Sequence, residues 1–411
     1  MLNNRWFQLV ASLTAMVMIA NLQYAWTLFV EPIRDARGWE LSAVQAAFTF
    51  FVLFQTWVQP LDGWFIDRLG PRGFITAAGV LCGLGWAGMG YATSLPVFYV
   101  LYCAAGTGAA FVYSGCIGSA LKWFKERRGL ASGIMAAGFG GGTALFIPLI
   151  SSHIKSNGYE STFLVSGVIQ GLVIVIAAQF LRHPPAESLT VAKSVATAGS
   201  QIGRRHFTTM EMLQTRQFYW LYAMFVLMAT GGLLVTANQG PIARAWGYSR
   251  DLLALAATIS PLANGTSRIF WGWVSDRLGR ESTMVLSFTL QAVCLLLVVG
   301  AGQSSGQWFV LSLALVYFTW GQIYSLFPAT SGDYFGSRNA TSNYAVLYTA
   351  KGVAAIGGGW IAARVFEVFG SWAFCFYGSA LMAIVAAVMA LRLRASAAAL
   401  KAADLRTAVA G

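Results

Sequence analysis

The stretch GWFIDRLGPR at residues 63–72 returns as GWVSDRLGR at residues 272–280, so the two copies begin 209 residues apart. Each copy follows a long apolar run and combines an acid, an arginine and a glycine, which is typical of a loop. A weaker echo pairs WFKER at residues 123–127 with YFGSR at residues 334–338, at nearly the same offset. Two echoes at one offset indicate an internal duplication, with two halves of similar structure.

The composition around these loops excludes a soluble protein. Of the 411 residues, 57% are hydrophobic, 14% aromatic and 10% charged, whereas soluble domains carry about 25% charged residues. The formal net charge is +12, because 27 Lys and Arg residues outnumber 15 Asp and Glu residues. We exclude a nucleic-acid partner in spite of this charge, because too little polar surface remains to form a basic face. A polytopic membrane protein is the class that remains.

Apolar runs divide the chain into expected membrane spans, since a bilayer core about 30 Å thick needs about 20 apolar residues per helix. Such runs lie near residues 6–30, 43–65, 74–92, 96–121, 129–152 and 160–182, and then near residues 217–241, 251–274, 282–300, 307–332, 339–365 and 371–392. We therefore predict an all-α membrane protein with twelve transmembrane helices in two six-helix bundles. The expected domains are an N-terminal bundle (1–182), a cytoplasmic linker (183–216), a C-terminal bundle (217–392) and a cytoplasmic tail (393–411).

Loop charges predict the orientation, because Lys and Arg gather on the cytoplasmic side of membrane proteins. Placing both termini on one side puts 19 basic residues there and 6 on the other. We therefore expect both termini in the cytoplasm. The first apolar run is too long for a signal peptide and lacks a cleavage site, so we expect it to be retained as the first span.

Two basic residues belong to neither side. Arg268 lies eight residues before Asp276 in the eighth expected helix, which places it about 12 Å inside the membrane end of that helix. Lys351 lies near the middle of the eleventh expected helix. A central Arg or Lys costs about 2.5 to 3.5 kcal/mol on insertion scales. No acid lies at the same depth, so an anionic substrate is the simplest partner for both. The alternative is that each side chain snorkels to an interface or donates to helix carbonyls.

Polar and aromatic residues at helical spacing accompany the two cations. The candidates for a binding site, besides Arg268 and Lys351, are Gln23, Tyr24, Gln45, Tyr113, Asn264, Trp320, Tyr324 and Tyr348. Each aromatic side chain alone is more simply explained by packing or by an interfacial belt. Buried amides are harder to explain in this way, because they need hydrogen-bond partners in hydrocarbon.

The glycine clusters follow no strand, so we interpret them as close helix packing and not as nucleotide loops. No metal ligand spacing is present, and we expect no metal and no cofactor.

The duplicated loops resemble the signature of the major facilitator superfamily between its second and third helices, together with the C-terminal copy of that signature. Five further stretches resemble the oxalate:formate antiporter family of bacterial carboxylate carriers: NRWF (4–7), QYAWTL (23–28), residues 264–273, FTWG (318–321) and AK (350–351). The resemblance implies that Arg268 and Lys351 bind the carboxylates of the substrate and that the polar and aromatic candidates line its pocket. Pro71 departs from the signature, where a basic residue is more common, and this bears on gating.

The resemblance also implies gating residues, since acids of the signature loops cap helix N-termini and pair with basic loop residues in this superfamily. The residues in these places are Asp67, Arg68, Arg127, Asp276, Arg277 and Arg338. The plain alternative is that they end helices at the membrane interface.

We therefore expect a secondary transporter of small carboxylate anions in the bacterial cytoplasmic membrane, and not an enzyme. Exchange of oxalate for formate by a monomer, through alternating access of the two bundles, is the first hypothesis. A proton-coupled symporter of lactate-like monocarboxylates is the alternative. That alternative needs a titratable group near the site, and Lys351 could lose its proton there when it is desolvated.

Overall fold

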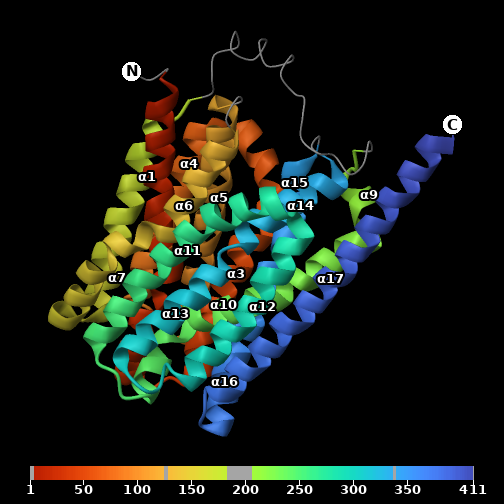
Figure 1. Cartoon of the computed structure of the whole chain (residues 1–411). Coiled ribbons are helices and arrows are strands. Elements are labelled where there is room, and N and C mark those ends of the chain that lie inside the picture. The colour runs from red at the N-terminus through yellow and green to blue at the C-terminus, as the bar shows by residue number, and fades with distance from the viewer. Residues whose placement is uncertain (1–3, 125–127, 183–205, 337–338, 411) are drawn as a thin grey trace.

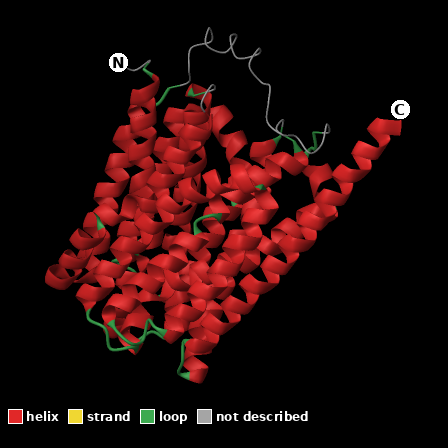
Figure 2. Cartoon of the chain, in the orientation of Figure 1, coloured by secondary structure: helices red, strands yellow, loops and turns green. Residues whose placement is uncertain are grey.

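The computed structural model describes residues 4–124, 128–182, 206–336 and 339–410, and these residues form helices and loops without a strand (Figure 2). The predicted all-α class is confirmed. The first half contains α1 (Arg5–Tyr24), α2 (Trp26–Arg37), α3 (Leu41–Trp57), η1 (Gln59–Leu61), α4 (Asp62–Met89), α5 (Leu95–Trp123), α6 (Arg128–Gly141), η3 (Gly142–Leu145) and α7 (Ile147–Phe180). The second half contains α9 (Thr209–Leu213), α10 (Arg216–Ala245), α11 (Arg250–Leu278), α12 (Arg280–Gly300), α13 (Gly306–Trp320), α14 (Ile323–Phe335), α15 (Ala340–Ala355), η5 (Ile356–Ile361), α16 (Ala362–Phe369) and α17 (Ala373–Ala410).

The duplication seen in the sequence is also a duplication of backbone geometry. Gly38 and Gly247 end equivalent helices of the two halves with φ of 66° and 74°. The two signature stretches, expected as loops, are helical up to residues 69 and 278, and Gly70 and Gly279 then turn the chain with φ of 67° and 84° and ψ of 165° and 157°. Positive φ favours glycine, because a Cβ atom clashes with the backbone there. Both pairs of glycines are 209 residues apart, which matches the offset of the sequence repeat.

Nine helices among the described residues are long and apolar enough to cross a membrane. Twelve spans were expected. One of the nine, residues 133–180, contains a chain reversal at Gly158, whose φ is 80°. Two further long helices, α4 and α11, are not among the nine. The multi-pass class is therefore clear, and the expected number of twelve is not confirmed by this count.

The two halves lie side by side, red to yellow and green to blue in Figure 1, with both termini at one end. Helices of one half pack against helices of the other, since α3 contacts α15, α6 contacts α11 and α2 contacts α10. Several helices at this interface are interrupted. The chain breaks between α1 and α2 at Ala25, between α13 and α14 at Gly321 and Gln322, and at the π-helical turn η5. The interface between the halves is therefore where irregular backbone and polar side chains meet.

Candidate functional site

Arg268 of α11 is buried at the interface of the halves, with 4% of its surface exposed. Its Nη1 donates to the carbonyl of Ala136 on α6 at 2.9 Å. Its Nη2 and Nε both donate to Oδ1 of Asn264, at 2.9 and 3.3 Å, from one turn earlier in the same helix. Asn264 is therefore the side chain that orients the guanidinium, as its predicted place beside Arg268 suggested.

Lys351 of α15 is fully buried. Its Nζ donates to Oε1 of Gln23 on α1 at 2.9 Å and to Oε1 of Gln55 on α3 at 2.7 Å. A longer contact of 3.4 Å reaches the hydroxyl of Tyr348. Both amides belong to the first half, so the ammonium of the second half is held across the interface. Neither Lys351 nor Arg268 forms an ion pair with an acid among the described residues.

The two cations share aromatic walls. The Arg268 guanidinium lies 4.4 Å from the centre of the Tyr324 ring and the Lys351 ammonium lies 5.8 Å from it. Phe139 of α6 contacts both cations from the other half, at 6.0 and 5.7 Å. The ring faces attract cations without neutralising them. The two positive charges therefore occupy one small aromatic compartment.

Further aromatic residues predicted from the sequence complete this compartment. Tyr113 stacks on Tyr348 with centroids 6.1 Å apart, and Tyr24 lies 5.7 Å from Phe139. Trp320 lies edge to face with Tyr324 at 5.4 Å. The indole of Trp320 covers α10 at Gly232, where a Cβ atom would collide with it.

Several hydrogen-bond donors around the cations have no partner within the described part of the chain. The buried atoms without one are Nε2 of Gln23, the hydroxyls of Tyr24 and Tyr324, and Nε1 of Trp320. Buried polar atoms are normally hydrogen-bonded, so each unpaired atom needs an explanation. An anion between Arg268 and Lys351 would accept from such donors. The site therefore combines two cations with unused donors and an aromatic lining.

Gln45 is placed differently from the other candidates. Its Oε1 accepts from Trp26 Nε1 at 3.0 Å, and its Nε2 donates to the Ala237 carbonyl at 2.8 Å. Both ends of the amide are used, and no described contact joins Gln45 to Arg268 or Lys351. Gln45 links α3 to α10 across the halves.

Two residues of the site, Gln55 and Phe139, are absent from the sequence-based candidates. Gln55 is a buried amide in the same helix as Gln45, and that signal was available in the sequence. Phe139 lies in the glycine cluster of residues 138–142, which was interpreted as a packing feature. That interpretation is confirmed at Gly140, where a Cβ atom would lie 3.0 Å from Cα of Gly265 and 3.2 Å from Nε of Arg268.

The candidate gating residues are only partly described. The backbone at Asp67 and Arg68 is helical, but their side chains lie outside the described part of the structure, as do Arg127 and Arg338 altogether. Asp276 pairs with Arg280 at 2.7 Å, and Arg280 also reaches Asp333 at 3.3 Å. Arg277 lies 3.7 Å above the ring of Trp273.

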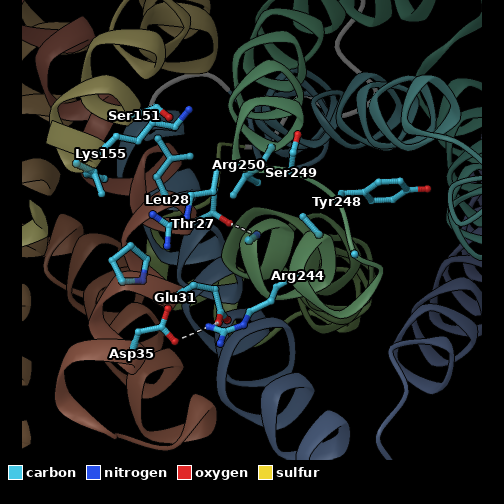
Figure 3. Close-up of a pocket in the computed structure, with 16 residues that line it drawn as sticks. Thr27, Leu28, Glu31, Asp35, Ser151, Lys155, Arg244, Tyr248, Ser249 and Arg250 are labelled. Carbon is cyan, nitrogen blue, oxygen red and sulfur yellow. Dashed lines mark hydrogen bonds and ion pairs between the residues drawn. The ribbon is translucent and has the colours of Figure 1, made fainter.

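A cavity of about 390 Å³ opens between the halves away from the two cations. It lies where α2 and α10 end and α11 begins, and we call this end of the molecule the distal face. Figure 3 shows Arg244 reaching from α10 toward Glu31 and Asp35 of α2 across this cavity. Lys155 of α7 pairs with Asp251 at the start of α11. These ion pairs join the halves at the distal face.

The described residues contain no group of three or more His, Cys, Asp or Glu side chains that could hold a metal ion.

Comparisons with known proteins cover both halves of the chain. The sequence model of the Major Facilitator Superfamily matches residues 11–239 and 219–407. The chain is 38% identical to the oxalate:formate antiporter of Oxalobacter formigenes over 390 residues, which is 95% of this chain and 91% of that protein. It is 25% identical to the uncharacterized MFS-type transporter YhjX of Escherichia coli, over 86% of each chain. It is also 25% identical to monocarboxylate transporter 12 of Xenopus laevis, over 70% of this chain and 66% of that protein.

Proposed function

The chain belongs to the Major Facilitator Superfamily, and from this premise we propose that it exchanges small carboxylate anions, oxalate against formate, by alternating access of its two halves. The resemblance to the antiporter family is confirmed by the 38% identity over 95% of the chain. The chain is accordingly a multi-pass membrane transporter rather than an enzyme. The observation that carries the substrate class is the pair of buried cations, Arg268 and Lys351, without a described acid.

A dicarboxylate fits this pair chemically. Arg268 offers a planar fork that grips one carboxylate through two parallel hydrogen bonds, and Lys351 supplies a compact charge for the other. A dianion brings the formal charge of the pair from +2 to 0. The unused donors of Gln23, Tyr24 and Trp320 supply further hydrogen bonds. The flat aromatic lining favours small planar substrates.

The same contacts support exchange over transport in one direction. In this structure the halves are tied by Lys351 to Gln23 and Gln55, and by Arg268 to the Ala136 carbonyl. Rocking the halves apart without an anion would break these bonds and leave two buried cations unpaired, which is costly. A carboxylate substitutes for the lost acceptors. The loaded carrier therefore crosses between its two states more readily than the empty one.

The proposal includes the twelve-span topology. Dividing residues 133–180 at Gly158 and adding α4 and α11 to the nine apolar helices brings the number to twelve. We propose an N-terminal bundle (1–182), a linker (183–216), a C-terminal bundle (217–392) and a tail (393–411). Both termini then lie in the cytoplasm, the distal face meets the periplasm, and the carrier works as a monomer in the bacterial cytoplasmic membrane. The excess of 19 basic residues over 6 supports this orientation.

Gating by the signature loops is part of the same proposal. Asp67 and Asp276, with Arg68, Arg127, Arg277 and Arg338, would hold the cytoplasmic side closed. The Asp276 to Arg280 to Asp333 ion pairs support this in the second half, because they connect the signature loop to α14.

Exchange in proteoliposomes tests the function. Vesicles loaded with unlabelled oxalate should take up labelled oxalate or formate through the parent carrier, and Arg268→Gln and Lys351→Gln should each reduce this exchange at least about a hundredfold. Arg364→Gln is the control, because Arg364 lies outside the site and, among the described residues, pairs with Glu367 of its own helix. Exchange at the parental rate in either site variant would refute the assignment.

The alternative remains a proton-coupled monocarboxylate symporter, which the similarity to monocarboxylate transporter 12 supports. Uptake of labelled lactate into empty vesicles, driven by an imposed pH gradient alone, would favour this alternative. Uptake that requires an internal anion would favour exchange.

A further inference from the structure

Asp62 is a buried carboxyl group that the carboxylate site does not use. It is the first residue of α4, only 5% of its surface is exposed, and neither carboxyl oxygen has a hydrogen-bond partner among the side chains that the structure describes. The hydroxyl of Ser114 on α5 lies beside it and is the one described side chain close enough to interact with it, and this hydroxyl also lies 3.4 Å from the carbonyl of Phe111. An ionised carboxylate in such a place would lose its hydration without compensation.

Buried polar side chains connect this carboxyl group with the central site. Gln55, Gln59 and Asp62 follow one another at spacings of four and three residues, and 2%, 9% and 5% of their surfaces are exposed. Gln55 lies at the end of α3, Gln59 begins η1 and Asp62 begins α4, and the backbone at Val58 and Leu61 between them is right-handed helical. Gln59 Nε2 donates to the backbone carbonyl of Gln55 at 3.3 Å. The side-chain Oε1 of Gln55 accepts from Lys351. Asp62 lies seven residues after Gln55 along the chain.

The elements packed most closely against α4 are α5, α7 and η1, and their charged groups decide whether an ionised Asp62 would be compensated. On α5 the charged side chain is Lys122, exposed near the end of the helix. On α7 the titratable side chains His153, Lys155, Tyr159 and Glu160 lie near the reversal at Gly158, and η1 carries none. On α4 itself Arg72 donates to Gln179 at 2.8 Å. The side chains of Asp67, Arg68 and residues 125–130 lie outside the described part of the structure.

We propose that Asp62 is a proton-binding site of the carrier, occupied in the conformation described here. Closure of the end of the molecule that carries the termini buries the carboxyl group, which takes one proton from water and becomes neutral. Opening of that end admits water to Gln55, Gln59 and Asp62, and the carboxyl group then ionises and returns its proton to water. The conformational cycle is thereby linked to pH. This linkage holds whichever carboxylate the central site carries.

Infrared spectroscopy detects the site directly, without transport. Protonated carboxylic acids give a carbonyl-stretch band, and this band shifts in heavy water. The purified parent carrier in nanodiscs should lose such a band when the pH is raised from acid to alkaline. The band should be absent in Asp62→Asn and displaced in Asp62→Glu. Glu40→Gln is the matched control, because Glu40 is an exposed carboxylate without a side-chain cap contact, and its band pattern should equal that of the parent.

Exchange measured with equal pH on both sides of the membrane gives the second readout. One linked proton changes the ratio of two conformations by at most about tenfold per pH unit. The parent should therefore show a pH-dependent exchange rate, Asp62→Asn a flat profile, and Glu40→Gln the parental profile. A parent without the band, or Asp62→Asn with the parental band or profile, would overturn the proposal. Should the carrier fail to exchange oxalate at all, the infrared result still decides whether Asp62 binds a proton.

Discussion

Lys351 is a buried ammonium held by neutral groups. Its two short hydrogen bonds go to amide oxygens of Gln23 and Gln55, and the surrounding ring faces add electrostatic attraction. Amide oxygens satisfy the donors without cancelling the charge. The ammonium therefore stays available to an anion, which could exchange places with the amides.

Removing one of these acceptors should destabilise the empty carrier more than the loaded one. Hydrogen bonds to charged groups contribute about 1.5 to 3 kcal/mol, so Gln55→Leu should lower the free energy of unfolding by about that amount. Oxalate should then raise the melting temperature of Gln55→Leu more than that of the parent, because a carboxylate replaces the lost acceptor. Thermal unfolding with and without oxalate measures this. Gln307→Leu, at an exposed position of α13, should leave both values unchanged. An equal oxalate shift in Gln55→Leu and the parent would contradict the exchange of amide for substrate.

The guanidinium geometry of Arg268 should matter beyond its charge. Three of its nitrogens are directed by the Ala136 carbonyl and by Asn264, and a lysine cannot reproduce this fork. Arg268→Lys should raise the half-saturation concentration for oxalate exchange by at least about tenfold, which corresponds to about 1.4 kcal/mol. Arg364→Lys is the control on an exposed arginine. Parental half-saturation in Arg268→Lys would mean that charge alone is needed there.

At the scale of helices, the turn η5 follows Lys351 by five residues and contains Gly357, Gly358 and Gly359. A Cβ atom at Gly358 would lie 2.6 Å from the backbone nitrogen of Leu234 on α10, so only glycine fits this approach. Thr49 of α3 donates to the Ala355 carbonyl at 3.0 Å and accepts from the Trp360 amide at 3.1 Å. These are the two backbone groups that an i to i+5 bond would join. A hydroxyl of the first half therefore supports the π turn of the second.

Replacing Thr49 by its isosteric apolar analogue should loosen this turn. Thr49→Val removes the hydroxyl that binds the Trp360 amide and the Ala355 carbonyl. A buried backbone group left without a partner lowers the free energy of unfolding by about 1 to 3 kcal/mol. Hydrogen exchange of the peptide containing residues 355–361 should accelerate, and substrate exchange should slow. Thr107→Val is the matched control, because its hydroxyl donates to the Cys103 carbonyl of its own helix at 3.0 Å. Unchanged protection in Thr49→Val would show that the π turn is stable by itself.

The sequence predicted which helices carry the site better than it predicted which faces point inward. Arg268, Lys351 and Asn264 were identified because charges and amides are costly in a membrane wherever they point. Gln45 and Gln55 carry the same signal on one helix, yet Gln45 binds Trp26 and Ala237 and Gln55 binds Lys351. Their roles depend on which helix of the other half lies opposite, and this is tertiary information. The π turn was likewise hidden, because its support comes from Thr49 in another helix.

At the scale of the whole molecule, the central site and the distal ion pairs both join the halves. Arg244 of α10 contacts Glu31 and Asp35 of α2, and Lys155 of α7 contacts Asp251 of α11. Glu367 of α16 adds a contact with the Ser42 amide of α3 at 2.7 Å. All of these contacts would have to break for the distal face to open. They therefore oppose opening on that side.

Removing Arg244 should populate the form that is open at the distal face. Exposed ion pairs contribute about 0.2 to 1 kcal/mol each, and the Arg244 side chain is 53% exposed, so its two pairs should shift the equilibrium by at most about thirtyfold. Leu253→Cys, in the wall of the distal cavity, reports this through its rate of modification by a membrane-impermeant thiol reagent. The rate should rise in Arg244→Gln, and raising the salt concentration should move the parent toward the same rate, because salt screens exposed pairs. Arg37→Gln is the control, because it removes a positive charge at the same face but breaks a contact with Tyr159 inside the first half, so it should not change the rate. An equal rise in both variants would mean that the loss of positive charge at the distal face, and not the contact between the halves, controls access to the cavity.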